Sequence, residues 1–380
     1  MQANAAWGSV LILKAGVPPL GDPEPRERGT PTFKLGDAAP RGCLRNAGLR
    51  PGSTGEQSRK HAGSETGAPA FSSTNLASAR IIYGVRTCVI FNPAARGNKA
   101  RHFRRHLDEI ASQGALKATA TPGDARRLAS EAVTDGFELI VAAGGDGTVN
   151  EVLNGIGDAA DGFARARLGV LPLGTVNVFA REIGLSLRIE RAWETLQRGR
   201  VTRLDLPRVE FSANGARQRQ YFVQLAGAGL DARAIELVTW PSKKKFGPMA
   251  YVIAGMKALR RRQSKITLHV EGQNVTGELI LIGNGRFYGG PLEIFSGADL
   301  RDGLLDICVV PRASWLTLLR YVPGLLARRR LPANTVQRFR ASAFELASDA
   351  PASFELDGEW VGNLPAAFTV AHEQLRVVVP

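Results

Sequence analysis

The stretch that decides the fold is residues 139–155, Leu-Ile-Val-Ala-Ala-Gly-Gly-Asp-Gly-Thr-Val-Asn-Glu-Val-Leu-Asn-Gly. Its apolar start, Leu139 to Ala143, predicts a buried strand, and the apolar spacing after Gly147 predicts a helix. A glycine-rich turn between a strand and a helix directs several backbone N–H groups at one point, where a phosphate can bind. Glycine suits such a turn because it has no side chain to hold the ligand away and because it accepts positive φ.

Asp146 places a carboxylate inside this candidate anion-binding turn. A negative side chain fits there when a divalent cation accompanies the phosphates, which makes Asp146 a candidate metal contact, direct or through water. Two plainer interpretations stay open at this point. Asp146 or Thr148 can cap the helix, and Gly-Gly-Asp-Gly can form a structural turn without a ligand.

Three more turns of the same kind occur nearby in the sequence. Residues 168–185 contain an apolar strand, a Gly-Thr turn and a predicted helix; residues 87–91 lead into Asn92-Pro93; and Thr119 and Thr121 end a strand-like segment before another helix. The carboxyl ends of parallel strands meet at one edge of a sheet, so these turns can face a single crevice. Together they predict a nucleotide site.

The coarse pattern predicts two kinds of architecture. Up to about residue 207 strands alternate with helices, which is typical of a parallel α/β domain, and from about 208 strands dominate. The predicted strands of the first part lie near 87–91, 115–120, 138–143 and 168–172, and its helices near 98–113, 123–135, 148–156 and 189–198. The later strands are predicted at 208–212, 218–225, 265–270, 277–282, 305–310, 338–345, 352–356, 368–370 and 374–379. The Gly-Asp-Gly turn differs from the dinucleotide fingerprint, which argues against a Rossmann oxidoreductase.

These turns, together with residues 283–290, 298–306 and 356–359, resemble the diacylglycerol kinase catalytic domain family in motif and in order. That family holds bacterial lipid kinases and the eukaryotic diacylglycerol, ceramide and sphingosine kinases. The resemblance covers roughly residues 85–380. It implies an α/β fold with an N-terminal parallel nucleotide-binding domain at 85–207, like that of NAD kinases and diacylglycerol kinases, and a C-terminal antiparallel β-sandwich domain at 208–380.

The resemblance also implies site residues, position by position. Glu359 is expected to be the general base that takes the proton from a substrate hydroxyl, and Asp146 is expected to join it as a catalytic residue. Mg²⁺ is expected at two places: a structural ion held by Asp299, Asp302 and the carbonyl of Leu304, and a catalytic network joined by Asp146 and Asp205. The residues expected to line the ATP site are Asn92, Thr119, Gly144, Gly145, Asp146, Gly147, Thr148, Val149, Asn150 and Thr175.

One position departs from the family pattern. The family commonly has Asn-Asp-Phe where this chain has Asn177-Val178-Phe179, so one carboxylate of the usual network is missing. The residues alone also leave plainer interpretations open: Glu359 as an exposed hairpin residue after Asp357-Gly358, and Asp299 and Asp302 as a surface turn. The segment around Asn284, Arg286 and Tyr288 fits a glycine-kinked strand bend equally well.

Composition limits the remaining choices. The chain of 380 residues has room for two ordinary domains, and no apolar stretch approaches the roughly 20 residues that span a bilayer. Cys43, Cys88 and Cys308 have no metal-like spacing and fit buried thiols of a reducing compartment. Residues 1–80 hold 11 Gly and 8 Pro without a sustained period, which predicts a disordered or spurious N-terminal extension.

The net charge of +14 favours an anionic partner. Two apolar segments, 246–259 and 315–326, are bordered by basic triplets, as in helices that lie in a lipid headgroup region; ordinary core helices are the plainer alternative. No aromatic-interleaved basic strand indicates nucleic-acid binding. We therefore expect a cytoplasmic protein that associates peripherally with anionic membranes, and a homodimer stays open.

Three functions remain in view. The favoured one is an ATP-dependent lipid kinase that phosphorylates diacylglycerol or a related lipid alcohol with ATP and Mg²⁺. The second is a kinase of a soluble alcohol like the NAD kinases, which share a Gly-Gly-Asp-Gly loop. The third is a catalytically weakened lipid- or nucleotide-binding protein, because Val178 replaces a carboxylate.

Overall fold

The computed structural model describes residues 85–93, 114–237, 257–259, 262–317 and 336–380. Every described residue belongs to one unit, within Ser72–Pro380. The predicted N-terminal extension 1–80, the predicted helix 98–113 and most of the two basic-bordered apolar segments lie outside the described residues. None of the helices described for this chain is long and apolar enough to cross a membrane.

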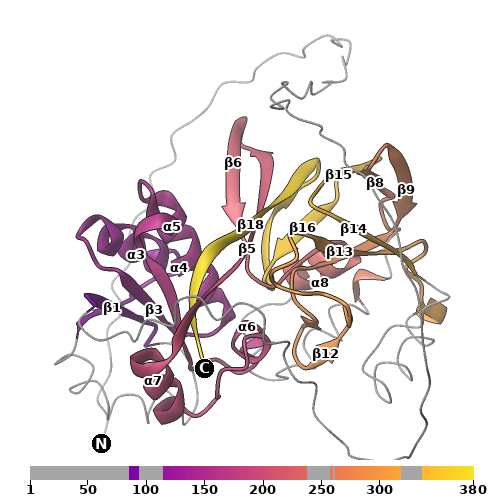
Figure 1. The fold of residues 1–380 in the computed structure, drawn as a ribbon. Helices are drawn as coiled ribbons and strands as arrows, with labels where there is room; N and C mark the ends of the chain where they lie inside the picture. The colour runs from indigo at the N-terminus through magenta and orange to yellow at the C-terminus, as the bar shows by residue number, and fades with distance from the viewer. Residues whose placement is uncertain (1–84, 94–113, 238–256, 260–261, 318–335) are drawn as a thin grey trace, which may run out of the picture. The chain divides into compact units, whose positions relative to one another are not determined.

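Helices are concentrated in the first half of the described chain (Figure 1). They are α3 (Asp124–Thr134), α4 (Asp146–Asp158), α5 (Gly162–Arg165), α6 (Val178–Glu182), α7 (Ile189–Arg198) and α8 (Leu230–Leu237). The strands are β1 (Thr87–Phe91), β2 (Ala115–Ala118), β3 (Leu139–Gly144), β4 (Arg167–Pro172), β5 (Arg200–Ala213), β6 (Ala216–Tyr221), β7 (Leu225–Gly229), β8 (Ile266–Val270), β9 (Gln273–Gly277), β10 (Leu279–Gly283), β11 (Phe287–Tyr288), β12 (Leu292–Glu293), β13 (Leu305–Val310), β14 (Gln337–Ala341), β15 (Ala343–Ser348), β16 (Ser353–Leu356), β17 (Glu359–Asn363) and β18 (Ala366–Val379).

The first four strands form a parallel sheet in the order β2-β1-β3-β4. All six residues of β3 are buried, as expected of a strand whose two faces are both covered. Its side chains join a core cluster with apolar residues of α3, α4 and α7, among them Val133, Leu153 and Leu196. The apolar runs of the sequence therefore form the expected parallel α/β arrangement.

Two long strands continue this sheet into the C-terminal half. β18 pairs parallel with β4 at Val377 and Leu168, and antiparallel with β5 along most of its length, as Figure 1 shows. The strands predicted at 368–370 and 374–379 are thus one strand, interrupted by a register shift between Ala371 and Leu375. Likewise β5 begins at Arg200, ahead of the strand predicted at 208.

A second, six-stranded sheet has the order β14-β13-β10-β7-β16-β17 and is antiparallel. It packs on the antiparallel part of the first sheet across one apolar cluster that draws side chains from both, including Phe354 of β16 and Phe368 of β18. Phe354 and Phe368 meet edge to face at 6.2 Å between ring centroids, the kind of aromatic contact that stabilises cores beyond buried area. The expected N-terminal parallel α/β part and C-terminal antiparallel β-sandwich are confirmed.

Two strand predictions were wrong for a physical reason. The strand predicted at 218–225 is broken after Tyr221, because the N–H groups of Val223, Gln224 and Leu225 donate to a carboxylate instead of to a neighbouring strand. The strand predicted at 338–345 is two strands in different sheets, β14 and β15, which separate at Ser342. Both breaks depend on partners that are remote in the sequence.

Candidate active site

The glycine turn after β3 and the turn after β4 lie against each other. The carbonyl of Gly144 accepts hydrogen bonds from the N–H groups of Leu173 (2.8 Å) and Gly174 (3.1 Å). A Cβ atom on Gly174 would lie 2.5 Å from the Cα of Gly145, so no larger residue fits there without displacing backbone. The approach of two turns through their glycines brings the predicted residues Gly144, Gly145 and Thr175 to one edge of the sheet.

The other two predicted turns join the same edge. The side-chain amide of Asn92, after β1, lies 3.5 Å from the hydroxyl of Thr148 at the start of α4. The N–H of Thr119, after β2, donates to the carbonyl of Phe91 at 2.9 Å. Four strand ends thus converge where the sequence predicts a nucleotide site. Val149 and Asn150, also predicted to line it, are buried within α4.

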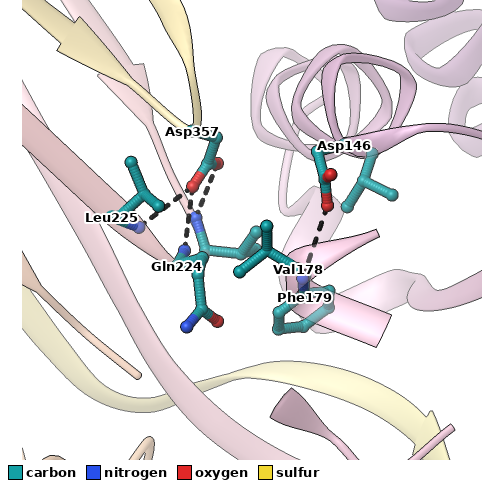
Figure 2. Close-up of a pocket in the computed structure, with 8 residues that line it drawn as sticks. Asp146, Val178, Phe179, Gln224, Leu225 and Asp357 are labelled. Carbon is teal, nitrogen blue, oxygen red and sulfur yellow. Dashed lines mark hydrogen bonds between the residues drawn. The ribbon is translucent and has the colours of Figure 1, made fainter. Parts of the chain in front are cut away.

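Asp146 begins α4 beside a small, largely apolar pocket (Figure 2). Burial raises the pKa of its carboxyl to about 6; the N–H of Phe179, which donates to it at 3.4 Å, opposes that shift, and the Asp357 carboxylate adds to it. Folding therefore disfavours the ionised form of Asp146. The pocket is lined by Asp146, Val149, Val178, Phe179, Val223, Gln224, Leu225 and Asp357.

Asp357 joins the segment 223–225 to helix α4. Its carboxylate accepts four hydrogen bonds, from the Asn150 side chain (2.8 Å) and from the N–H groups of Val223 (3.0 Å), Gln224 (2.9 Å) and Leu225 (3.1 Å). Burial raises the pKa of this carboxyl, and these four donors act against that shift. Sequence reasoning treated Asp357 only as a turn former. In the structure its carboxylate also connects α4 with the chain between β6 and β7.

Glu359 follows two residues after Asp357, across a tight turn in which Asp357 (φ 50°) and Gly358 (φ 87°) both have positive φ. Its carboxylate lies directly against Gly147: a Cβ on that glycine would collide with Oε1 and would lie 3.2 Å from the carboxyl carbon. The absence of a side chain at Gly147 is therefore what admits Glu359. Glu359 thus lies against the residue that follows Asp146, the other residue predicted to be catalytic.

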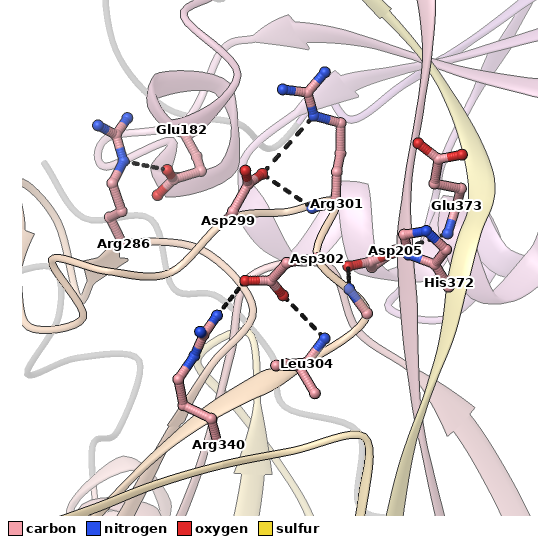
Figure 3. Close-up of polar contacts among 11 residues, drawn as sticks. Glu182, Asp205, Arg286, Asp299, Arg301, Asp302, Leu304, Arg340, His372 and Glu373 are labelled. Atoms are coloured by element: carbon pink, nitrogen blue, oxygen red, sulfur yellow. Dashed lines mark hydrogen bonds and ion pairs between the residues drawn. The ribbon is translucent and has the colours of Figure 1, made fainter. Parts of the chain in front are cut away.

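The predicted metal loop is folded, but its carboxylates are balanced by arginines (Figure 3). Asp299 accepts the N–H of Arg301 at 3.1 Å and lies 3.8 Å from that residue's guanidinium group. Asp302 accepts the N–H of Leu304 at 3.0 Å and is ion-paired with Arg340. This loop is ordered by its own hydrogen bonds and ion pairs.

Asp205 joins this loop to the sheet. Its fully buried carboxylate accepts the N–H groups of Gly303 (2.7 Å) and Glu373 (2.9 Å) and pairs with the His372 ring at 2.9 Å. All these contacts are with the loop or with the irregular stretch of β18, as Figure 3 shows. Asp205 and the predicted metal loop are thus brought together.

The residues near Asp146 fit a Mg²⁺ ion that arrives with nucleotide phosphates. Within the described parts of the chain, no three acidic, His or Cys side chains are grouped as a protein-only metal site would require. Mg²⁺ at phosphates usually takes one or two carboxylates from the protein. Asp146 would supply one, and the buried Oδ1 of Asn177 is a second oxygen that lacks a hydrogen-bond partner within the described structure. Asp299, Asp302 and Leu304 fit Mg²⁺ in donor type, although Arg340 would compete for Asp302.

Glu182 is a further site residue that sequence reasoning missed. Its carboxylate is 4% exposed and accepts hydrogen bonds from Gln224 Nε2 (2.9 Å), Arg286 Nε (2.9 Å) and the N–H of Phe287 (3.0 Å). It therefore ties helix α6 to the 284–287 segment, for which the sequence left two interpretations open. The local sequence Glu182-Ile183-Gly184, at the end of α6, carries no signal of this role.

Comparison with known proteins identifies the class. Residues 86–209 match the model of the diacylglycerol kinase catalytic domain, and residues 224–379 match that of the YegS C-terminal NAD kinase beta sandwich-like domain. The chain is 31% identical over 309 residues to a diacylglycerol kinase of Bacillus subtilis (strain 168), covering 78% of this chain and 96% of that protein. A diacylglycerol kinase of Staphylococcus carnosus (strain TM300) is 29% identical over 306 residues, with 78% and 95% covered.

A solved structure has the same fold. The crystal structure of a diacylglycerol kinase from Bacillus anthracis str. Sterne superposes with a TM-score of 0.61 at 22% identity, over 78% of this chain and 97% of that one. The protein belongs to the diacylglycerol kinase catalytic domain family, and the expectation of a kinase enzyme is confirmed.

Proposed function

We propose that this protein is an ATP-dependent lipid kinase that transfers the γ-phosphate to the hydroxyl of diacylglycerol or a related lipid alcohol. The observation that carries the proposal is the position of the Glu359 carboxylate against Gly147, inside the glycine turn that begins α4. Phosphoryl transfer requires positioned phosphates, a cation and a base near the attacking hydroxyl. The site offers a candidate for each, and relatives named diacylglycerol kinase favour a lipid acceptor.

In this mechanism residues 85–207 bind ATP and residues 208–380 bind the lipid. Backbone N–H groups of the turn at Gly144–Gly147 hold the phosphates, with Asn92, Thr119 and Thr175 along the same edge. Glu359 accepts the hydroxyl proton as the lipid oxygen bonds to the γ-phosphorus. The bond from that phosphorus to the bridging oxygen breaks, and ADP leaves.

Mg²⁺, when bound, neutralises charge on the phosphates. Asp146 is the side chain proposed to contact it, directly or through water. Asp299, Asp302 and the Leu304 carbonyl are proposed to hold a second, structural ion, with Asp205 fixing the loop behind them. The apolar side chain of Val178 cannot contribute a ligand, so we propose that the metal network has one carboxylate fewer than is common in the family.

A peripheral position on an anionic membrane fits this function. Large apolar side chains are exposed at Trp315, Leu316 and Trp360, with exposed fractions of 45%, 75% and 48%. Trp360 directly follows Glu359 at the start of β17. Aromatic side chains of this kind favour the boundary between lipid and water. The net charge of +14 favours anionic headgroups in the same way.

The test is a transfer assay with γ-labelled ATP and Mg²⁺, offered diacylglycerol, a sphingoid base or NAD in separate reactions. We expect labelled lipid from diacylglycerol or another lipid alcohol in mixed micelles. Label in NAD without labelled lipid would instead favour the soluble-alcohol kinase. ATP binding without transfer to any alcohol would favour the weakened binding protein, and Val178→Asp would then test whether the missing carboxylate is the cause.

A further inference from the structure

A buried cluster of three oxygen-bearing side chains lies behind the Glu359 turn. The hydroxyl of Tyr288, on β11, lies 2.7 Å from Oδ2 of Asp231 on α8 and 3.0 Å from Oε1 of Glu355 on β16. The three converge on Gly227, where an added Cβ would lie 2.6 Å from both the Asp231 and Tyr288 oxygens and 2.9 Å from that of Glu355. None of these residues is among those proposed to contact ATP or lipid.

The number of donors requires a bound proton in this cluster. A tyrosine hydroxyl has one hydrogen and can donate to only one carboxylate, so the second short contact needs a donor of its own. Asp231 lies in the first turn of α8, where the helix end favours negative charge. Glu355 is fully buried. Its burial is the main reason why its pKa lies well above the usual range, and repulsion from the Asp231 carboxylate raises the pKa further. Burial raises the pKa of Asp231 as well, so the two carboxyls together hold the proton that the second contact with Tyr288 requires.

The other oxygen of Glu355 reaches the turn that carries Glu359. Oε2 accepts the N–H of Gly358 at 2.7 Å, one residue before the proposed base. Gly358 has φ 87° and Asp357 has φ 50°, so this turn has a backbone conformation that needs support from outside. Asp357 holds one side of the turn through Asn150, and Glu355 holds the other.

We propose that Tyr288, Asp231 and Glu355, with one proton shared by the two carboxyls, form a positioning network that fixes the Gly358 turn and so sets where Glu359 meets the substrate hydroxyl. The proposal rests on the proposed function, in which Glu359 is the base. None of the three is a catalytic residue, because they act through the Gly358 amide. Tyr288 orients Glu355, and Gly227 leaves the space in which the three side chains meet.

The experiment compares Tyr288→Phe, Glu355→Ala and Glu355→Gln with the full-length wild-type chain. Hydrogen–deuterium exchange of peptides covering 353–362 reads the turn directly, and kcat and KM for ATP in the lipid assay read its consequence. Loss of one buried hydrogen bond predicts about tenfold faster exchange of the turn and about tenfold lower kcat in Tyr288→Phe, with KM for ATP unchanged. Glu355→Gln keeps an acceptor for Gly358 and a donor for Tyr288, so it should restore most of what Glu355→Ala loses.

Tyr221→Phe is the matched control, because it removes a tyrosine hydroxyl from a half-buried ring that packs on Phe163 instead. Circular dichroism and Tm identify a variant that has not folded. If a Glu355 variant fails to fold, the result for Tyr288→Phe, the mildest change, decides whether the network holds the turn. Unchanged exchange of the turn in folded Tyr288→Phe and Glu355→Ala would overturn the network. A wild type without lipid kinase activity would overturn the proposed function, while the exchange data would still decide whether the network holds the turn.

Discussion

Gly147 has no room for a side chain, because the carboxylate of Glu359 lies against its Cα. The obstructing atoms are the end of a flexible side chain rather than backbone, so Gly147→Ala displaces Glu359 without disturbing the helix. We expect kcat for lipid phosphorylation to fall more than about tenfold, since misplacing a catalytic group is costly, while Tm stays nearly constant. Steady-state kinetics and thermal unfolding measure the two effects.

Gly297→Ala is the control for this substitution. An added Cβ at Gly297 meets nothing within 4 Å, so neither kcat nor Tm should change. Equal losses of activity in the two variants would show that Glu359 does not occupy the place described here.

The ionised carboxylate of Asp146 lowers the free energy of unfolding by an amount that depends on pH. Its pKa rises from 3.8 to about 6 on folding, so the folded protein binds the proton more tightly than the unfolded chain. The stabilising contribution of the protonated carboxyl is fully present below the pKa of the unfolded chain. It is lost as pH rises through the pKa of the folded protein. Asp146→Asn should therefore raise the free energy of unfolding by about 2 kcal/mol near pH 8, allowing for partial solvent access, and by much less near pH 4.

Denaturant titration of both proteins without divalent cations checks this difference. Asp161→Asn, on an exposed loop residue, is the control and should show no such pH-dependent gain. If the stability advantage of Asp146→Asn were the same at both pH values, the carboxylate would not be desolvated as described.

At the scale of elements, helices α3 and α4 pack through a second critical glycine. A Cβ on Gly155 would collide with the carbonyl oxygen of Arg126 and lie 2.7 Å from the Cβ of Ala129. Backbone cannot yield as a side-chain tip can, so Gly155→Ala should lower the free energy of unfolding by about 1–3 kcal/mol. Chemical denaturation measures this, with Gly297→Ala again as the neutral comparison. An unchanged midpoint would mean that the two helices are not packed this closely.

The helices and strands of the N-terminal α/β part could be predicted because the sequence patterns that indicate them are local. The buried run Leu139 to Ala143 ends at glycines, and β3 indeed covers Leu139–Gly144. The break between β6 and β7 could not be predicted, since it exists only because Asp357 supplies the acceptor for three N–H groups. Likewise, nothing near Tyr288 in the sequence indicates that Asp231 and Glu355 meet its hydroxyl. Sequence patterns record periodicity well, but they do not record which distant carboxylate accepts a bond.

At the scale of the whole molecule, the site exists because two distant parts of the chain meet. Asn150 and Asp357 are 207 residues apart and are joined by a 2.8 Å hydrogen bond. β18 completes the arrangement by pairing with β4 of the parallel sheet and with β5. The glycine turns proposed to hold phosphates and the turn that carries Glu359 therefore become neighbours only in the finished fold. That dependence explains why the sequence motifs indicate candidate site residues but not the contacts between them.

The central claim is that Glu359 is the base for a phosphoryl transfer at the Gly144–Gly147 turn. The most direct test is kcat for diacylglycerol phosphorylation by Glu359→Gln, measured together with the Kd for ATP. Glu345→Gln, an exposed glutamate on β15, is the matched control. We expect a loss of about 10²- to 10⁴-fold in kcat with the Kd for ATP unchanged, because the amide cannot accept the proton. A Glu359→Gln protein that phosphorylates lipid at the rate of Glu345→Gln would contradict it.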